Sequence, residues 1–168
     1  NLIKKNSFVG GKEVLTFEKN FAKFTNSKYC VGVGNGTDAL EIAIESLNLK
    51  KDSEVIVPTN TWISTAEAVT RNGLRVVFCD ISLKDYTIDI DDLKKKISNK
   101  TSAIMVVHLF GYPANLKRIK KIAKKRKIKI IEDCAQAHGS KVENQHVGTF
   151  GDIGTFSFFP GKNLGAYG

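Results

Sequence analysis

Two spacings of apolar residues alternate along the chain and predict two kinds of element. Continuous apolar runs, such as 54–58 and 102–108, are typical of strands buried on both faces. Between such runs, apolar residues recur every three or four positions, as at Leu40, Ala43 and Leu47, which indicates helices. The pattern predicts helices over 12–26, 37–47, 61–71, 91–97 and 115–127, strands over 29–33, 54–58, 75–80, 102–108, 129–133 and 154–159, and a hairpin around 142–147.

The order of these elements indicates the fold class. Strands that alternate with helices predict an α/β three-layer sandwich, with helices on both faces of a mostly parallel sheet. In open sheets of this kind, ligands bind beyond the carboxyl ends of the strands. Asp80, His108 and Asp133 each end a predicted strand, so we expect functional side chains among them.

The net charge is concentrated on one segment. The formal charge is +9, with 26 basic and 17 acidic residues, which would by default suggest an anionic partner. Nine basic residues and no acidic one lie in 117–129, and the rest of the chain is balanced. A narrow apolar stripe there predicts a helix that lies on the sheet with a solvated outer face. The alternative is a nucleic-acid-binding module that uses 117–129, although the aromatic residues typical of single-strand binding are absent from it.

Cysteine and histidine usage favours neither a disulfide framework nor a metal site. Cys30, Cys79 and Cys134 are odd in number and far apart, which predicts free thiols in a reducing cytoplasm. The three histidines show no metal-ligand spacing with them. The longest apolar runs are also too short to span a bilayer.

The turn GNGTD at 34–38 is the first segment with candidate chemistry. Glycines let a backbone approach a ligand closely, and the free N–H groups of a helix start suit a phosphate. The spacing matches neither a dinucleotide-binding fingerprint nor a P-loop, which also argues against a nicotinamide-dependent enzyme. The alternative is an ordinary helix start with Thr37 at or near the N-cap.

Three further residues have both a functional and a structural interpretation. Asp133, at a strand end in EDCAQAHG, could hold a cationic nitrogen or simply cap a helix. Lys162 follows an apolar strand and a Pro-Gly turn; it could be a nucleophile in a partly dry site, or a surface lysine. Trp62, the only tryptophan, could cover a planar ring or pack in the core.

Taken together and in this order, the segments resemble one family. The chain carries GNGTDAL, NTWISTAEAV, VHLFGYPAN, EDCAQAHGS and GTFGDIGTFSFFPGKNLG, with the fourth and fifth the most specific. This set resembles the DegT/DnrJ/StrS-type sugar aminotransferases, which are pyridoxal-phosphate enzymes of fold type I. The resemblance runs from about Phe8 to Gly168.

The resemblance implies roles around the cofactor ring. Lys162 matches the lysine that holds the cofactor as an internal aldimine and then moves a proton between substrate and cofactor. Asp133 matches the aspartate that keeps the pyridinium nitrogen protonated, so that the ring accepts electrons. Gln136 matches the glutamine beside the ring hydroxyl, and Trp62 the aromatic residue that stacks on the ring.

The resemblance also implies a phosphate cradle at the glycine turn. Gly36, Thr37, the backbone of Asp38 and Ser157 match the residues that hold the cofactor phosphate. The phosphate turn and the place of Asp133 also follow from the residues themselves, whereas the identity of the cofactor and the role of Lys162 rest on the resemblance.

The implied reaction transfers an amino group, usually from L-glutamate, to a keto group of a nucleotide-linked sugar. Such aminosugars enter bacterial surface polysaccharides or glycosylated metabolites. The ending KNLGAYG favours the branch that acts at the C3 keto group, and Lys162 argues against the relatives that carry histidine there and perform dehydration.

The implied enzyme is larger than 168 residues. The family continues into the rest of a large domain and a small C-terminal domain, and works as a homodimer with a shared active site. We therefore expect 1–168 to be part of the cofactor-binding domain. This piece alone should bind cofactor weakly and turn over little.

Overall fold

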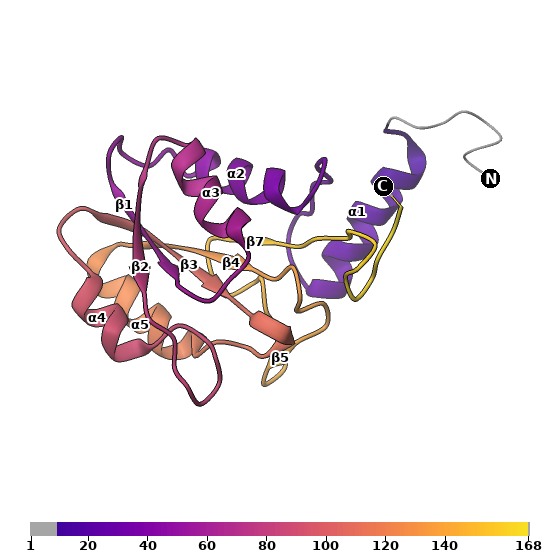
Figure 1. Ribbon diagram of the computed structural model, residues 1–168. Helices are drawn as coiled ribbons and strands as arrows, with labels where there is room; N and C mark the ends of the chain where they lie inside the picture. The colour runs from indigo at the N-terminus through magenta and orange to yellow at the C-terminus, as the bar shows by residue number, and fades with distance from the viewer. Residues whose placement is uncertain (1–9, 168) are drawn as a thin grey trace.

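The fold is a three-layer α/β sandwich in a computed structural model that describes residues 10–167 (Figure 1). The central sheet has the order β2-β1-β3-β4-β7, and every neighbouring pair is parallel. Its strands are β1 (Glu54–Pro58), β2 (Arg75–Cys79), β3 (Thr101–Val107), β4 (Lys129–Asp133) and β7 (Ile153–Thr155). The helices are α1 (Lys12–Thr25), α2 (Gly36–Ser46), α3 (Ile63–Arg71), α4 (Ile90–Lys96) and α5 (Leu116–Arg126). A short antiparallel hairpin joins β5 (Lys141–Val142) and β6 (Gln145–His146).

Alternation along the strands divides the core into two halves. In β1, Val55 and Val57 pack with residues of α2 and α3, whereas Ile56 packs with residues of α4 and α5. Figure 1 shows these helix pairs on opposite faces of the sheet. Continuous apolar strands thus have both faces covered, which confirms the predicted fold class.

The N-terminal helix α1 holds the C-terminal segment in place. Its Phe21 contacts Phe156 and Phe158 edge-on, with ring centroids 5.0 and 5.3 Å apart. Figure 1 shows α1 beside the yellow C-terminal stretch. Because that stretch carries Lys162, this aromatic cluster helps to fix the position of the candidate nucleophile relative to the sheet.

One predicted strand is wrong and another is shorter than predicted. Segment 29–33 is not a strand, and Val31 in it is 75% exposed. Its apolar residues favour an extended chain, but a strand needs a neighbour, and within residues 10–167 no segment pairs with it. The strand predicted over 154–159 pairs only through β7, and the chain leaves the sheet after Thr155. The other predicted elements are present with ends shifted by at most two residues.

The basic segment is confirmed as an amphipathic helix. In α5, Leu116, Ile119 and Ala123 are buried against the sheet, and most of the cationic side chains point to solvent. Within the described part of the chain, no helix combines the length and the apolar character needed to cross a membrane.

Candidate active site

A small pocket at the carboxyl ends of β3 and β4 brings together the residues predicted to surround a cofactor ring, but not those of the predicted phosphate cradle. Its lining includes Thr61, Trp62, His108, Asp133, Gln136 and Lys162. Four of these were predicted to surround a cofactor ring, although they come from segments as far apart as 62 and 162. Asp80 ends β2 at the edge of the sheet and is not among the lining residues.

Asp133 forms a buried, negatively charged wall of the pocket. The residue is 5% exposed, and its Oδ2 accepts a hydrogen bond from Thr65 Oγ1 at 3.0 Å. Its Oδ1 accepts one from the backbone N–H of Ala135 at 3.1 Å. No helix begins at Asp133, so the cap interpretation is wrong.

The Asp133 carboxylate lacks a cationic partner of its own. Burial raises the pKa of Asp133 above its usual value, and the hydrogen bonds from Ala135 and Thr65 and the nearby charge of Lys162 only partly offset this. Within residues 10–167 no cationic group lies within 4.0 Å of it. A buried carboxylate is stabilised by a cation at short range, so this wall of the pocket suits a positively charged group.

Lys162 and Trp62 border the same pocket. Lys162 sits in a folded turn, where its backbone N–H donates to Phe159 O at 2.8 Å and its carbonyl accepts from Gly165 N at 3.0 Å. Trp62 precedes α3 and is 71% exposed, so the expectation of core packing is wrong. Its ring is available to a planar ligand.

Gln136 is oriented by a strained turn. Its Oε1 accepts a hydrogen bond from the backbone N–H of Phe110 at 2.8 Å. Phe110 has a φ of 53° inside the 3-10 turn Leu109–Gly111, a conformation uncommon for residues other than glycine. Because this bond uses the amide oxygen, the Gln136 amide nitrogen keeps its two protons for a ligand.

Three residues of the predicted phosphate cradle, Gly36, Thr37 and Ser157, lie together at the start of α2, whereas the backbone N–H of Asp38 is already bonded to Asn35. An ideal Cβ added at Gly36 would lie 2.9 Å from Ser157 Cβ, so only glycine lets the helix start approach Ser157 this closely. The N-cap is Asn35, whose Oδ1 accepts from the N–H groups of Thr37 and Asp38 at 2.9 and 3.0 Å. The helix start is thus capped, as the alternative interpretation expected, but by Asn35, and Thr37 lies two residues after the cap with its hydroxyl free of a capping role.

Two neighbouring hydroxyl residues of the site were missed from the sequence. Ser64 Oγ lies 2.8 Å from Thr37 Oγ1, and Thr65 holds Asp133. Both belong to the first turn of α3, which begins directly after Trp62. The sequence signal that could have identified them is a pair of consecutive hydroxyl residues shortly after a predicted strand and turn.

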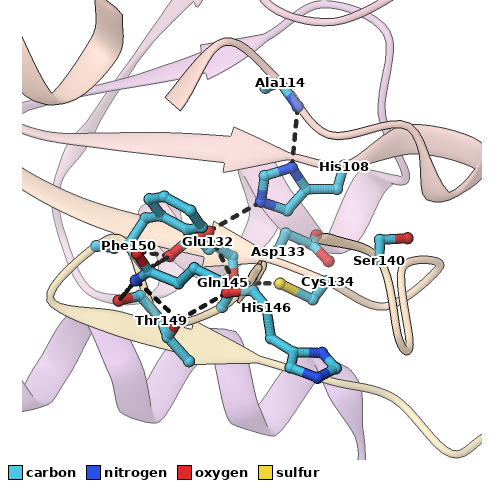
Figure 2. Close-up of polar contacts among 12 residues, drawn as sticks. His108, Ala114, Glu132, Asp133, Cys134, Ser140, Gln145, His146, Thr149 and Phe150 are labelled. Carbon is cyan, nitrogen blue, oxygen red and sulfur yellow. Dashed lines mark hydrogen bonds and ion pairs between the residues drawn. The ribbon is translucent and has the colours of Figure 1, made fainter. Parts of the chain in front are cut away.

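The opposite face of β4 holds a second buried carboxylate (Figure 2). Glu132 has no exposed surface, and it accepts hydrogen bonds from His108 Nε2 and from three backbone N–H groups, at 2.7 to 3.0 Å. These backbone donors are Gly148, Phe150 and Gly151. Burial opposes ionisation, but the hydrogen bonds from His108, Gly151 and Gly148 outweigh it and hold the pKa of Glu132 below its usual value.

The tautomer of His108 follows from this network. Its Nδ1 accepts the backbone N–H of Ala114 at 3.1 Å, so the ring proton is on Nε2 and is donated to Glu132. Cys134 Sγ lies close enough to complete a possible three-ligand metal set. However, burial raises the pKa of this thiol well above its usual value, and Glu132 and His108 already bind protein groups. We interpret the cluster as a structural network.

Comparison with known proteins identifies the family to which the chain belongs. The model of the DegT/DnrJ/EryC1/StrS aminotransferase family matches residues 1–168. A UDP-N-acetyl-3-dehydro-alpha-D-glucosamine 3-aminotransferase of Acidithiobacillus ferrooxidans is 45% identical over 162 residues, covering 96% of this chain and 44% of that protein. The GDP-perosamine synthase of Escherichia coli O157:H7 is 43% identical over 154 residues, covering 92% and 42%. The chain thus spans less than half the length of these relatives.

Solved structures show the same architecture. The aminotransferase from Psychrobacter cryohalolentis superposes with a TM-score of 0.95 at 35% identity, covering 99% of this chain and 43% of that one. The E. coli GDP-4-keto-6-deoxy-D-mannose-3-dehydratase with bound hydrated PLP superposes with a TM-score of 0.89 at 38% identity, covering 94% and 42%. This chain belongs to the DegT/DnrJ/EryC1/StrS aminotransferase family.

Proposed function

We propose that the protein binds pyridoxal 5'-phosphate in the pocket at the ends of β3 and β4 and transfers an amino group to a keto group of a nucleotide-linked sugar. One observation carries this proposal. A buried carboxylate without a cationic partner, Asp133, lines the same pocket as Lys162, and the exposed ring of Trp62 borders it. A protonated pyridine ring supplies the missing cation and offers a face to the tryptophan.

The residues present fit this cofactor at both ends. Asp133 would accept a hydrogen bond from the protonated ring nitrogen, and the free amide protons of Gln136 would be donated to the ring hydroxyl. At the other end, the close approach of Gly36 and Ser157, with Thr37 beside them, leaves hydroxyl groups for the phosphate. When bound, the cofactor supplies an electron sink for the carbanion formed at the reacting carbon.

Lys162 has the role of covalent anchor and proton carrier in this proposal. Its amine would hold the cofactor by condensing with the aldehyde group, with loss of water, and after replacement by the amine of the donor it would carry a proton to or from the reacting carbon. Because a lysine can do both, we propose amino transfer rather than the dehydration named for the E. coli relative. We also propose L-glutamate as the donor and keep carbon 3 of the sugar as the predicted position.

The remaining partners are part of the same proposal. We expect the working enzyme to be a homodimer that contains further large-domain sequence and a small domain in addition to residues 1–168. Cys30, Cys79 and Cys134 are free thiols, which suits a reducing cytoplasm. No observation favours nucleic acid as a ligand of α5.

Covalent capture tests the assignment of the anchor. The protein in its full natural length is loaded with pyridoxal phosphate, reduced with borohydride and digested, and the labelled peptide is identified by mass spectrometry. We expect the label on Lys162, its loss in Lys162→Ala, and its retention in Lys124→Ala on the exposed face of α5. A label that persists in Lys162→Ala would remove Lys162 from the proposal.

A further inference from the structure

The first turn of α3 connects the two ends of the candidate site. Ser64 and Thr65 are consecutive, so their side chains leave the helix in directions about 100° apart. Ser64 Oγ lies 2.8 Å from Thr37 Oγ1, at the phosphate end. Thr65 Oγ1 lies 3.0 Å from Asp133 Oδ2, at the wall that suits the ring nitrogen.

The hydrogen bonds at the Asp133 end have a defined direction. A carboxylate only accepts, so the Thr65 hydroxyl gives its single proton to Asp133. Thr61 Oγ1 lies 2.8 Å from Thr65 Oγ1 and must therefore be the donor in that pair. The chain Thr61→Thr65→Asp133 is shielded from water at its centre, since Thr65 has no exposed surface. Hydrogen bonds that run in one direction strengthen one another, and this chain fixes the position of one oxygen of the Asp133 carboxylate.

The phosphate end is tied to the same turn. Ser64 is buried, and its bond to Thr37 crosses from α3 to the start of α2. Thr37 follows Gly36, whose contact with Ser157 closes the cradle. The rotamer of Thr37 is thereby set from α3, although Ser64 itself stands outside the predicted cradle.

We propose that Ser64 and Thr65 are positioning residues that set, from one helical turn, the orientation of the phosphate-binding hydroxyl of Thr37 and of the ring-binding carboxylate of Asp133. This inference rests on the proposed function and adds two residues to it. Adjacent residues on a rigid turn hold the two ends of the site at a fixed separation, which favours a ligand of one length.

Thr65→Val tests the ring end in the protein of full natural length. Valine keeps the shape and removes the hydroxyl. Since a hydrogen bond to a charged group is lost, we expect kcat to fall about 10- to 100-fold, with KM for the amino donor changed less than about threefold. The 15N resonance of ring-labelled cofactor should move toward the unprotonated position. Thr65→Ser, which restores a hydroxyl, should recover most of both signals.

Thr70→Val is the matched control for this experiment. It lies on the same helix, and its exposed hydroxyl bonds only to the backbone oxygen of Glu67. We expect no change in kcat or in the 15N resonance. If Thr65→Val binds cofactor with the wild-type 15N resonance and the wild-type kcat, the inference is wrong at the ring end.

Ser64→Ala tests the phosphate end by comparing two probes. Loss of the bond that orients Thr37 should weaken pyridoxal phosphate about 3- to 10-fold, in line with one hydrogen bond, while pyridoxal, which lacks the phosphate, should bind as to the wild type. The ring-nitrogen resonance should stay in place. An equal loss for both probes would overturn the phosphate-end assignment. Failure of the wild-type protein to bind pyridoxal phosphate would instead overturn the proposed function itself.

Discussion

Two neighbouring carboxylates on β4 differ in how many hydrogen bonds they accept and in the direction in which their pKa values are shifted. Glu132 and Asp133 are consecutive, so they project from opposite faces of the sheet. Glu132 accepts four hydrogen bonds, and these hold its pKa below the usual value. Asp133 accepts two, and burial raises its pKa. The protein alone supplies four donors to the first carboxylate but only two to the second, which lines the pocket.

Under the proposed function, this difference separates a structural buried carboxylate from one that binds the cofactor. Burial alone marks both residues equally, and so does position at a strand end. What distinguishes them is the number of donors within reach and the presence of a pocket at Asp133. An incompletely satisfied charge costs stability in the free protein, and natural sites commonly accept this cost for function.

The largest expected effect is the loss of the structural carboxylate. Glu132→Gln replaces an acceptor by an amide nitrogen that faces backbone N–H groups, and leaves those donors unsatisfied. We expect the free energy of unfolding to fall by about 3–5 kcal/mol, because at least two buried donors lose their acceptor. Urea denaturation measures it. The control is Glu143→Gln, which changes an exposed glutamate paired with Lys117. This substitution should barely change the urea concentration at the unfolding midpoint. If Glu132→Gln lowers the stability as little as Glu143→Gln does, Glu132 is not the structural carboxylate described above.

Two glycines allow the same distinction between a structural and a ligand-binding role to be tested at the backbone. A Cβ at Gly151, a donor to Glu132, would meet the backbone oxygen of Ile130 at 2.6 Å, whereas a Cβ at Gly36 would meet the Ser157 side chain. We expect Gly151→Ala to destabilise the fold by about 1–3 kcal/mol. Gly36→Ala should mainly weaken pyridoxal phosphate, which equilibrium binding measures. If Gly36→Ala instead lowers stability as much as Gly151→Ala, the helix start is structural.

The sequence predicts the helices and strands better than it predicts the difference between Glu132 and Asp133. Apolar runs and helical spacing are local, so β1 and α5 were predictable almost to the residue. Segment 29–33 was not, because strand formation depends on a neighbour that local composition does not specify. Among site residues, Asp133 could be placed by the strand-end rule, and Lys162 by its resemblance to a family. The donors of Glu132 come from 148–151, and no local pattern predicts that they converge.

Asp133→Asn is expected to separate stability from function. Asparagine removes a buried charge that lacks a cationic partner within residues 10–167, so the free protein should gain about 1 kcal/mol at neutral pH. The same change removes the acceptor that keeps the ring nitrogen protonated, so turnover should drop sharply while some cofactor still binds. Urea denaturation without cofactor and steady-state kinetics measure the two effects. A less stable Asn variant would mean that Asp133 is structural.

The pH dependence of stability gives the finest test, because the two carboxylates have opposite signs. The pKa of Glu132 is lowered from a usual value of 4.5, so its contribution is present above that pH and is lost as the pH falls through the folded-state value. The pKa of Asp133 is raised from 3.8, so the folded state binds its proton more tightly, and stability falls as the pH rises from 3.8 through the raised value. The advantage of Asp133→Asn over the wild type should therefore grow with pH across that window and then stay constant. Unfolding free energies of the two proteins, measured across the acidic range and up to neutral pH, must diverge in this direction. Parallel curves would mean that Asp133 has an ordinary pKa in the free protein, and that its charge is already satisfied without a ligand.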